Sequence, residues 1–229
     1  MGVFCACFLR TSTLNSVVIW AGILLCVAGN ALGLGVILGR WLRFRRNVGE
    51  ALVAAEIAAK FHRPHVLMNN ITFQAGTVTT QIDHILVADT GIFVIETKHY
   101  RGWIFGDAAA RKWTQVIYRY KSRFQNPLHQ NSGHIKALQK MFTLAEDVYA
   151  GVVVFTGSAE FKTVRVPGVL KLVELMTYLA QERPVIFDER KMAYIVGRIE
   201  MQRLRRSIET DEYHLNSIQQ RILSRRNIA

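Results

Sequence analysis

Two acidic residues and one lysine in a short apolar segment are the side chains whose types and spacing best suit chemistry. Asp83 lies in the run Gln81–Ala88, and Glu96 and Lys98 close the run Ile92–Lys98. Two carboxylates can share a divalent metal ion, which polarises a phosphoryl oxygen and lowers the pKa of a bound water. A nearby lysine can orient or deprotonate that water, or stabilise the negative charge that develops on the phosphate. The three residues together predict hydrolysis of phosphodiester bonds.

A β-hairpin must position these groups. Both runs are rich in β-branched residues, and Asp89-Thr90-Gly91 lies between them as a turn signal. Side chains alternate along a strand, so Glu96 and Lys98 share one face. A turn at Thr90 places Asp83 opposite them, with Cβ atoms roughly 4.5–7 Å apart. The alternative is a surface Glu–Lys pair beside an unrelated aspartate.

The histidines beside the acids are not expected to join the site. His84 and His99 are the neighbours of Asp83 and Lys98 in sequence. Because neighbours on a strand point to opposite faces, both rings should point away from the charged side chains.

The periodicity of apolar residues predicts further elements around the hairpin. Strands are expected over residues 66–73, 102–105, 112–118, 151–155 and 185–187, and helices over 49–61, 128–143, 169–181 and 189–226. Strands that cluster early and helices that flank them favour an α/β or α+β fold with a mixed sheet.

The N-terminal part of the chain predicts a membrane anchor. Residues 1–16 form a tail, residues 17–39 are apolar except for Asn30, and residues 40–47 are basic. About 20 apolar residues span a bilayer, whereas the apolar part of a cleaved signal peptide, the alternative, is roughly 7–15 residues long. Positive residues stay cytoplasmic, so the N-terminus should face outward from the cell membrane and the rest should be cytoplasmic. Self-association is expected from Gly29, Gly33, Gly35 and Gly39, although glycine is also common in membrane helices.

The charge balance favours polyanionic partners. The chain carries 29 Lys and Arg against 17 Asp and Glu, a net charge of +12. Residues 108–145 contain no acid, and their cations are interleaved with aromatic residues, which predicts a rim that binds nucleic acid. The alternatives are a solvated strand face over core aromatics and a surface for anionic lipid headgroups. The predicted contacts are Arg111, Lys112, Arg119, Lys121 and Arg123.

Cysteine usage excludes two classes of domain. The three cysteines all lie in the first 26 residues. A disulfide-stapled fold and a cysteine-ligated zinc site are therefore excluded for the polar part of the chain.

Several short motifs follow one another over about residues 48–160. They are Gly49-Glu50, Gln81-Ile82-Asp83-His84, Ile95-Glu96-Thr97-Lys98, Gly102, Trp113 and Asn126-Pro127-x-x-Gln130. Together and in this order they resemble the nuclease-related domain (NERD) family, which is assigned to the restriction-endonuclease-like superfamily.

The resemblance implies a restriction-endonuclease-like α/β core and a site for Mg²⁺ (or Mn²⁺). Asp83 and Glu96 look like the metal ligands, and Lys98 looks like the catalytic lysine. Glu50 looks like an acidic residue contributed by the first helix, and Gln130 looks like a polar residue that opens the following helix. Taken alone, Glu50 also suits the dipole of its helix and Gln130 also suits a helix cap.

These observations lead to the expectation of a membrane-anchored cytoplasmic nuclease that acts on nucleic acid, with DNA favoured. The nuclease domain is expected over residues 48–165 and a basic, mostly helical extension over 166–229. One alternative is a membrane-tethered protein that keeps the fold and binds nucleic acid or a protein partner without catalysis. Another is a structural membrane protein whose basic domain contacts lipid headgroups.

Overall fold

Residues 48–75, 78–205 and 210 are described by the computed structural model. The predicted tail, transmembrane helix and basic linker, residues 1–47, lie outside these residues. Among the helices that are described, none is both long enough and apolar enough to cross a bilayer.

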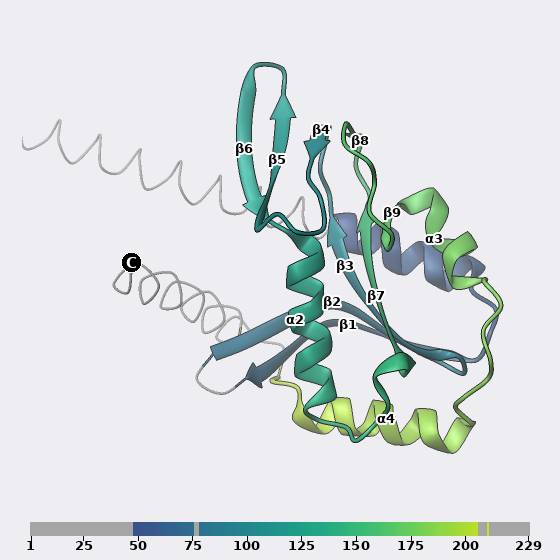
Figure 1. Cartoon of the computed structure of the whole chain (residues 1–229). Coiled ribbons are helices and arrows are strands. Elements are labelled where there is room, and N and C mark those ends of the chain that lie inside the picture. Colours follow the sequence, from purple (N-terminus) through teal and green to yellow (C-terminus); the bar gives the residue numbers. More distant parts are fainter. Residues whose placement is uncertain (1–47, 76–77, 206–209, 211–229) are drawn as a thin grey trace, which may run out of the picture. The chain divides into compact units, whose positions relative to one another are not determined.

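Two mixed sheets form the centre of the described part of the chain (Figure 1). The larger sheet has the strand order β1-β2-β3-β7-β9, and the smaller has the order β6-β5-β4-β8. The larger sheet contains β1 (His65–Ala75), β2 (Val78–Ala88), β3 (Gly91–Lys98), β7 (Tyr149–Phe155) and β9 (Val169–Lys171). The smaller sheet contains β4 (Gly102–Phe105), β5 (Lys112–Ile117), β6 (Tyr120–Gln125) and β8 (Ala159–Phe161).

Helices cover both faces of the larger sheet (Figure 1). Helices α2 (Pro127–Gln139) and α4 (Glu189–Gln202) pack on one face, where Leu138 and Ile195 join the core. The helix over residues 48–60 and α3 (Leu172–Leu179) pack on the other, through Ile57 and Leu175. A 3-10 turn, η1 (Glu146–Val148), leads into β7. The expectation of a mixed sheet flanked by helices is confirmed as a mixed α/β fold.

The predicted β2–β3 hairpin is present. Its two-residue loop, Asp89-Thr90, joins Ala88 to its partner Gly91. Gly91 has φ +143°, and a Cβ there would lie 2.8 Å from the carbonyl oxygen of Val148. Glycine is therefore required at this turn both by backbone conformation and by the close approach of the chain.

Several predicted elements differ from the structure. The predicted helix 128–143 ends at Gln139, and residues 185–187, predicted as a short strand, form none. The predicted helix 169–181 begins as strand β9, because Val169–Lys171 pair in parallel with Val153–Phe155 of β7. Of the predicted helix 189–226, α4 ends at Gln202, and Arg203 forms an antiparallel bridge with Phe73. Residues 206–209 and 211–226 of this prediction lie outside the described residues. At Val169–Lys171 and at Arg203, pairing with a distant strand overrides the local helical periodicity.

Candidate active site

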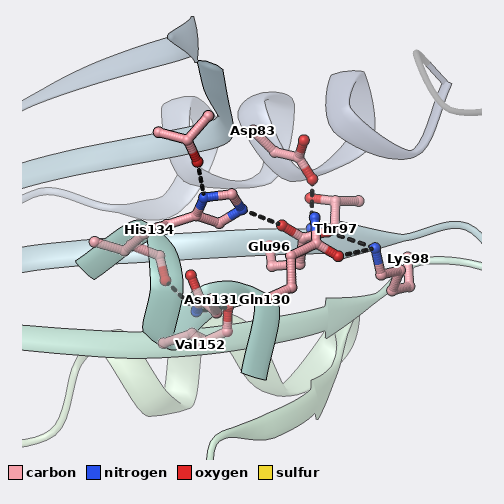
Figure 2. Close-up of polar contacts among 10 residues, drawn as sticks. Asp83, Glu96, Thr97, Lys98, Gln130, Asn131, His134 and Val152 are labelled. Atoms are coloured by element: carbon pink, nitrogen blue, oxygen red, sulfur yellow. Dashed lines mark hydrogen bonds and ion pairs between the residues drawn. The ribbon is translucent and has the colours of Figure 1, made fainter. Parts of the chain in front are cut away.

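Glu96 lies at the centre of a buried polar cluster (Figure 2). Only 2% of this residue is exposed, and it is held on β3 between β2 and β7. Its Oε1 accepts a hydrogen bond from Nζ of Lys98 at 2.5 Å, and its Oε2 lies 3.2 Å from Nε2 of His134. Both carboxylate oxygens therefore have a polar partner from the protein.

Lys98 links β3 to helix α2. Its position two residues after Glu96 puts both side chains on one strand face, as the sequence predicts. Besides the ion pair with Glu96, its Nζ donates to Oε1 of Gln130 at 3.1 Å. Gln130 lies in the first turn of α2, which begins immediately after the side-chain cap Asn126. The structure thus brings Glu96, Lys98 and Gln130 together.

Asp83 approaches the same strand where β2 and β3 diverge. The hairpin ladder ends at the pair His84 and Ile95, so Asp83 and Glu96 would form the next pair. Instead, Oδ2 of Asp83 accepts a 2.8 Å hydrogen bond from the backbone N–H of Thr97. Beyond Ile95, the only strand of the larger sheet that pairs with β3 in the described residues is β7. The side chain of Asp83 thereby replaces part of the ladder at the place where the strands separate.

Two other carboxylates lie within electrostatic reach of Asp83. Burial raises the pKa of Asp83 well above its usual value, and the negative charges of Glu96 and Glu50 raise it further, against the opposing charge of Lys98. Glu50 is 4% exposed and lies at the start of the helix over residues 48–60. The helix over residues 48–60 contributes one acid to this region, and strands β2 and β3 contribute one each.

The charges of Glu96 and Lys98 stabilise each other. Burial alone would raise the pKa of Glu96, but the charge of Lys98 and the hydrogen bond to His134 outweigh it and lower the pKa. Burial alone would lower the pKa of Lys98, but the charges of Glu96 and Asp83 outweigh it and raise the pKa. At neutral pH the cluster holds an ionised carboxylate beside a protonated ammonium.

Sequence reasoning missed two residues of α2. His134 connects Glu96 to β2, because its Nδ1 lies 2.8 Å from Oγ1 of Thr80. Asn131 is buried and donates to the backbone carbonyls of Val94 and Val152, which fixes α2 over β3 and β7. The spacing of four residues between Gln130 and His134 puts both on one helix face. That spacing was the available signal for His134.

His84 and His99, which the sequence places outside the cluster, have hydrogen-bond partners away from it. Nδ1 of His84 lies 2.7 Å from Oδ1 of Asn69, and Nδ1 of His99 lies 3.0 Å from Oγ1 of Thr156. Burial lowers the pKa of His84 to about 4, against the opposing charge of Glu96. His84 is therefore a neutral ring at neutral pH.

The chemistry of the carboxylates suits a hard divalent cation. Asp83 and Glu96 offer oxygen ligands, and their repulsion is the kind that a cation relieves. In the described part of the chain, no group of three or more His, Cys, Asp and Glu residues is arranged to hold a metal ion. Mg²⁺ keeps several waters and is commonly bound by one or two carboxylates. Two carboxylates together with coordinated waters are a donor set that suits a hydrated Mg²⁺ ion.

The five predicted nucleic-acid contacts lie on or beside the β5–β6 hairpin, which projects from the rest of the domain (Figure 1). All five side chains are exposed. Arg119 lies over the ring of Tyr120, with its guanidinium carbon 5.5 Å from the ring centroid. The hairpin leads through Asn126 directly into α2, and hence to Gln130. The basic residues form a surface next in sequence to the buried cluster.

Comparison with known proteins supports a nuclease-related domain. Residues 45–156 match the family model of the nuclease-related domain, NERD, which confirms the resemblance that the sequence motifs indicate for this part of the chain. A Bacillus anthracis protein described as uncharacterized is 46% identical over 98 residues, which make up 42% of this chain and 46% of that relative. The chain thus matches slightly less than half the length of that relative. No solved structure matches the chain.

Proposed function

We propose that the protein is a metal-dependent nuclease of the restriction-endonuclease-like type that hydrolyses phosphodiester bonds, with DNA as the favoured substrate. One observation carries the proposal. Within a nuclease-related domain, Lys98 joins Glu96 to Gln130 in a buried cluster that also contains Asp83. A surface ion pair, the alternative for Glu96 and Lys98, does not account for a glutamate that is 2% exposed.

In the proposed mechanism, Asp83 and Glu96 would hold Mg²⁺ or Mn²⁺, with Glu50 nearby as a further acid. When bound, such an ion supplies polarisation of the phosphoryl oxygen and a more acidic water. His134 and Lys98 fix the carboxylate of Glu96 from two sides. Gln130 holds the ammonium of Lys98 toward the cluster.

The proposed role of Lys98 follows from the contacts of its ammonium. Its Nζ donates to the carboxylate of Glu96 and to the amide oxygen of Gln130, and both contacts favour the protonated form over a free amine that could remove a proton from water. A fixed ammonium is well suited to stabilise the negative charge that grows on the phosphate in the transition state. Of the two roles expected from the sequence, we propose charge stabilisation.

We also propose that the nuclease is held at the cell membrane by residues 17–39, with its N-terminus outside and the nuclease domain in the cytoplasm. The apolar length of this segment and the arginines that follow it support the proposal. The glycine spacings within it support self-association.

A cleavage assay tests the catalytic proposal. The full-length chain is incubated with end-labelled single-stranded and duplex DNA and RNA, with Mg²⁺ or with EDTA. Cleavage should require Mg²⁺ and should fall by about 100-fold or more in Lys98→Ala. Lys60→Ala is the matched control, because Lys60 forms an exposed ion pair with Glu56 at 2.7 Å and should leave cleavage unchanged.

A second function is favoured by the exposed basic hairpin. Wild-type protein that binds nucleic acid in a salt-dependent manner, yet cleaves none of these substrates, would identify a non-catalytic binding protein instead. Equal loss of cleavage in Lys98→Ala and Lys60→Ala would remove the cluster from the mechanism.

A further inference from the structure

The smaller sheet has one buried face and one outer face. Ile104 and Trp113 of β4 and β5 are buried and pack with Phe155 of β7. Because side chains alternate along each strand, the neighbours of Ile104 point to the opposite side. Accordingly, Trp103 is 49% exposed. A large aromatic side chain therefore stands on the outer face of this sheet.

The register aligns this tryptophan with a cation two strands away. Trp103 pairs with Val116 on β5, and Val116 pairs with Lys121 on β6. Residues directly opposite each other in a sheet share a face. Trp103 and Lys121 therefore lie in one row across the outer face.

A second row across the outer face again aligns an aromatic residue on β4 with a cation on β6. Phe105 pairs with Thr114, and Thr114 pairs with Arg123. The two rows lie two residues apart along the strands, about 6.5 Å. Lys112 follows on the same face of β5, since it is two residues from Thr114. We call Trp103, Phe105, Lys112, Lys121 and Arg123 the stacking face.

The charge across this face is uneven. Nζ of Lys162 lies 4.9 Å from the centroid of the Trp103 ring. The acid Glu160 pairs with Trp103 from strand β8, and it is ion-paired with Lys162 at 2.8 Å. The opposite edge, strand β6, presents Lys121 and Arg123, for which the described residues show no ion pair with an acid. A phosphate backbone is therefore attracted along the β5–β6 side of the aromatic rings.

We propose that the stacking face binds single-stranded nucleic acid. Aromatic side chains stack on bases that are free of pairing, and flanking cations neutralise the phosphates. In a duplex the faces of the bases are covered by their neighbours, so the exposed ring of Trp103 has no such surface to meet. A four-stranded sheet with aromatic residues on its open face is a general way of holding single strands.

The connections of the sheet lead to the buried cluster at both ends. Strand β4 begins at Gly102, shortly after Lys98, and β6 ends at Gln125, shortly before Gln130. Gly102 has φ +77°, and a Cβ there would collide with the carbonyl oxygen of Val116, so glycine is required where β4 begins. A strand bound on the stacking face would be held by the segment that joins two cluster residues. The inference that such a strand is the substrate rests on the proposed function, whereas binding itself does not.

Binding of a labelled oligodeoxythymidine to the full-length chain in EDTA tests the proposal without cleavage. Trp103→Ala should weaken binding by about tenfold or more. The double variant Lys121→Ala/Arg123→Ala should weaken binding and flatten the slope of log K against log salt by about 1.4, or about 0.7 for each phosphate that is no longer neutralised. The matched control is Lys191→Ala/Tyr194→Ala, which removes an exposed cation–ring pair of 5.5 Å on α4 and should change nothing.

A fluorescence measurement separates stacking from folding. Tryptophan emission should be quenched by the oligonucleotide in wild-type protein, and this quenching should be largely lost in Trp103→Phe although binding persists. Trp103→Leu, which keeps an apolar side chain, should bind as weakly as Trp103→Ala if both variants have the wild-type circular dichroism spectrum.

Several results would overturn the proposal. These are unchanged binding in Trp103→Ala and Trp103→Leu, binding of duplex as tight as that of the single strand, or oligonucleotide binding that the control pair weakens equally. Preference for vesicles of anionic phospholipid over the oligonucleotide would assign the face to lipid instead. Trp103-dependent binding by a protein that shows no Mg²⁺-dependent cleavage would retain the stacking face and refute only the proposed catalysis.

Discussion

Asp83 combines burial with two neighbouring acids, and this combination opposes folding. Its pKa is raised by burial and by the charges of Glu96 and Glu50, so its ionised form is disfavoured in the folded state. Asparagine would keep an oxygen acceptor for the N–H of Thr97 and remove the charge. We predict that Asp83→Asn is more stable than the wild type in EDTA at neutral pH, by about 1–2 kcal/mol, and that it loses cleavage.

The sign of the pH dependence follows from the raised pKa. The folded state binds more protons than the unfolded state between the usual pKa of 3.8 and the raised value. The free energy of unfolding of the wild type therefore falls as pH rises from the usual to the raised pKa of Asp83. Asp83→Asn has no such proton to lose, so the difference in free energy of unfolding in its favour should grow with pH over this range. Urea unfolding at several pH values measures this difference, and Asp147→Asn is the control because Asp147 is exposed. A variant less stable than the wild type at neutral pH would contradict the account.

Ionisation of His84 makes the free energy of unfolding depend on pH in the opposite direction. Burial lowers its folded pKa from 6.5 to about 4, so the unfolded state binds more protons between these values. The stability that depends on the neutral ring is present above pH 6.5 and is lost as pH falls toward 4. The shift of about 2.5 pH units corresponds to up to about 3 kcal/mol at 1.36 kcal/mol per unit.

Urea unfolding in EDTA between pH 6.5 and 4 measures this loss. His84→Gln should show a flatter decline of the free energy of unfolding than the wild type, whereas exposed His62→Gln should follow the wild type. Parallel declines in wild type and His84→Gln would contradict a neutral buried ring.

Helix α2 delivers Gln130 and His134 to the cluster, and a single buried residue fixes where it begins. Asn126 caps the helix by accepting from the N–H of Leu128 at 2.9 Å. Its Nδ2 lies 2.7–3.2 Å from the backbone carbonyl oxygens of Asp107, Ala108 and Ala110. One amide therefore ties the start of α2 to the loop between β4 and β5.

We predict that Asn126→Ala destabilises the protein by about 2–4 kcal/mol, because it removes a helix cap and the hydrogen bonds from a buried amide to the loop between β4 and β5. Cleavage should fall as well, since Gln130 and His134 lose their position. Asn126→Asp keeps the capping oxygen and loses the N–H donors, so its stability should lie between those of the wild type and Asn126→Ala. Thermal unfolding and cleavage of the three proteins test this, and equal stability of Asn126→Ala and wild type would contradict it.

The divergence of β2 and β3 was not visible in the sequence. Alternation and the Asp89-Thr90-Gly91 turn predicted the hairpin and placed Asp83 opposite Glu96, and the observed register agrees up to the pair His84 and Ile95. The ladder with β2 ends there, whereas on its other edge β3 stays paired through Lys98 with β7, a strand more than 50 residues later. Such long-range pairing has no local signal.

At the scale of the whole molecule, local patterns predicted the residues with strong chemistry, and packing supplied the rest. Glu96-x-Lys98 and Asp83 were recognisable because charges in an apolar strand are rare. Their partner His134 depended on how α2 lies across β2 and β3, which Asn131 fixes through the carbonyl of Val94. The division into two sheets likewise depended on the pairing of β4 with β8, which are far apart in sequence.

The central claim is that the buried carboxylate cluster hydrolyses phosphodiester bonds with a bound divalent ion. Its most direct measurement is Mg²⁺-dependent cleavage of an end-labelled DNA strand by wild type, Glu96→Gln and Glu56→Gln, each as the full-length chain. Glu96 and Glu56 both pair with a lysine, but Glu96 is buried in the cluster and Glu56 lies on the helix over residues 48–60. We predict that wild type and Glu56→Gln cleave alike and that Glu96→Gln loses about 100-fold or more of the activity. Cleavage by Glu96→Gln at the wild-type rate, or wild-type cleavage that persists in EDTA, would contradict the account.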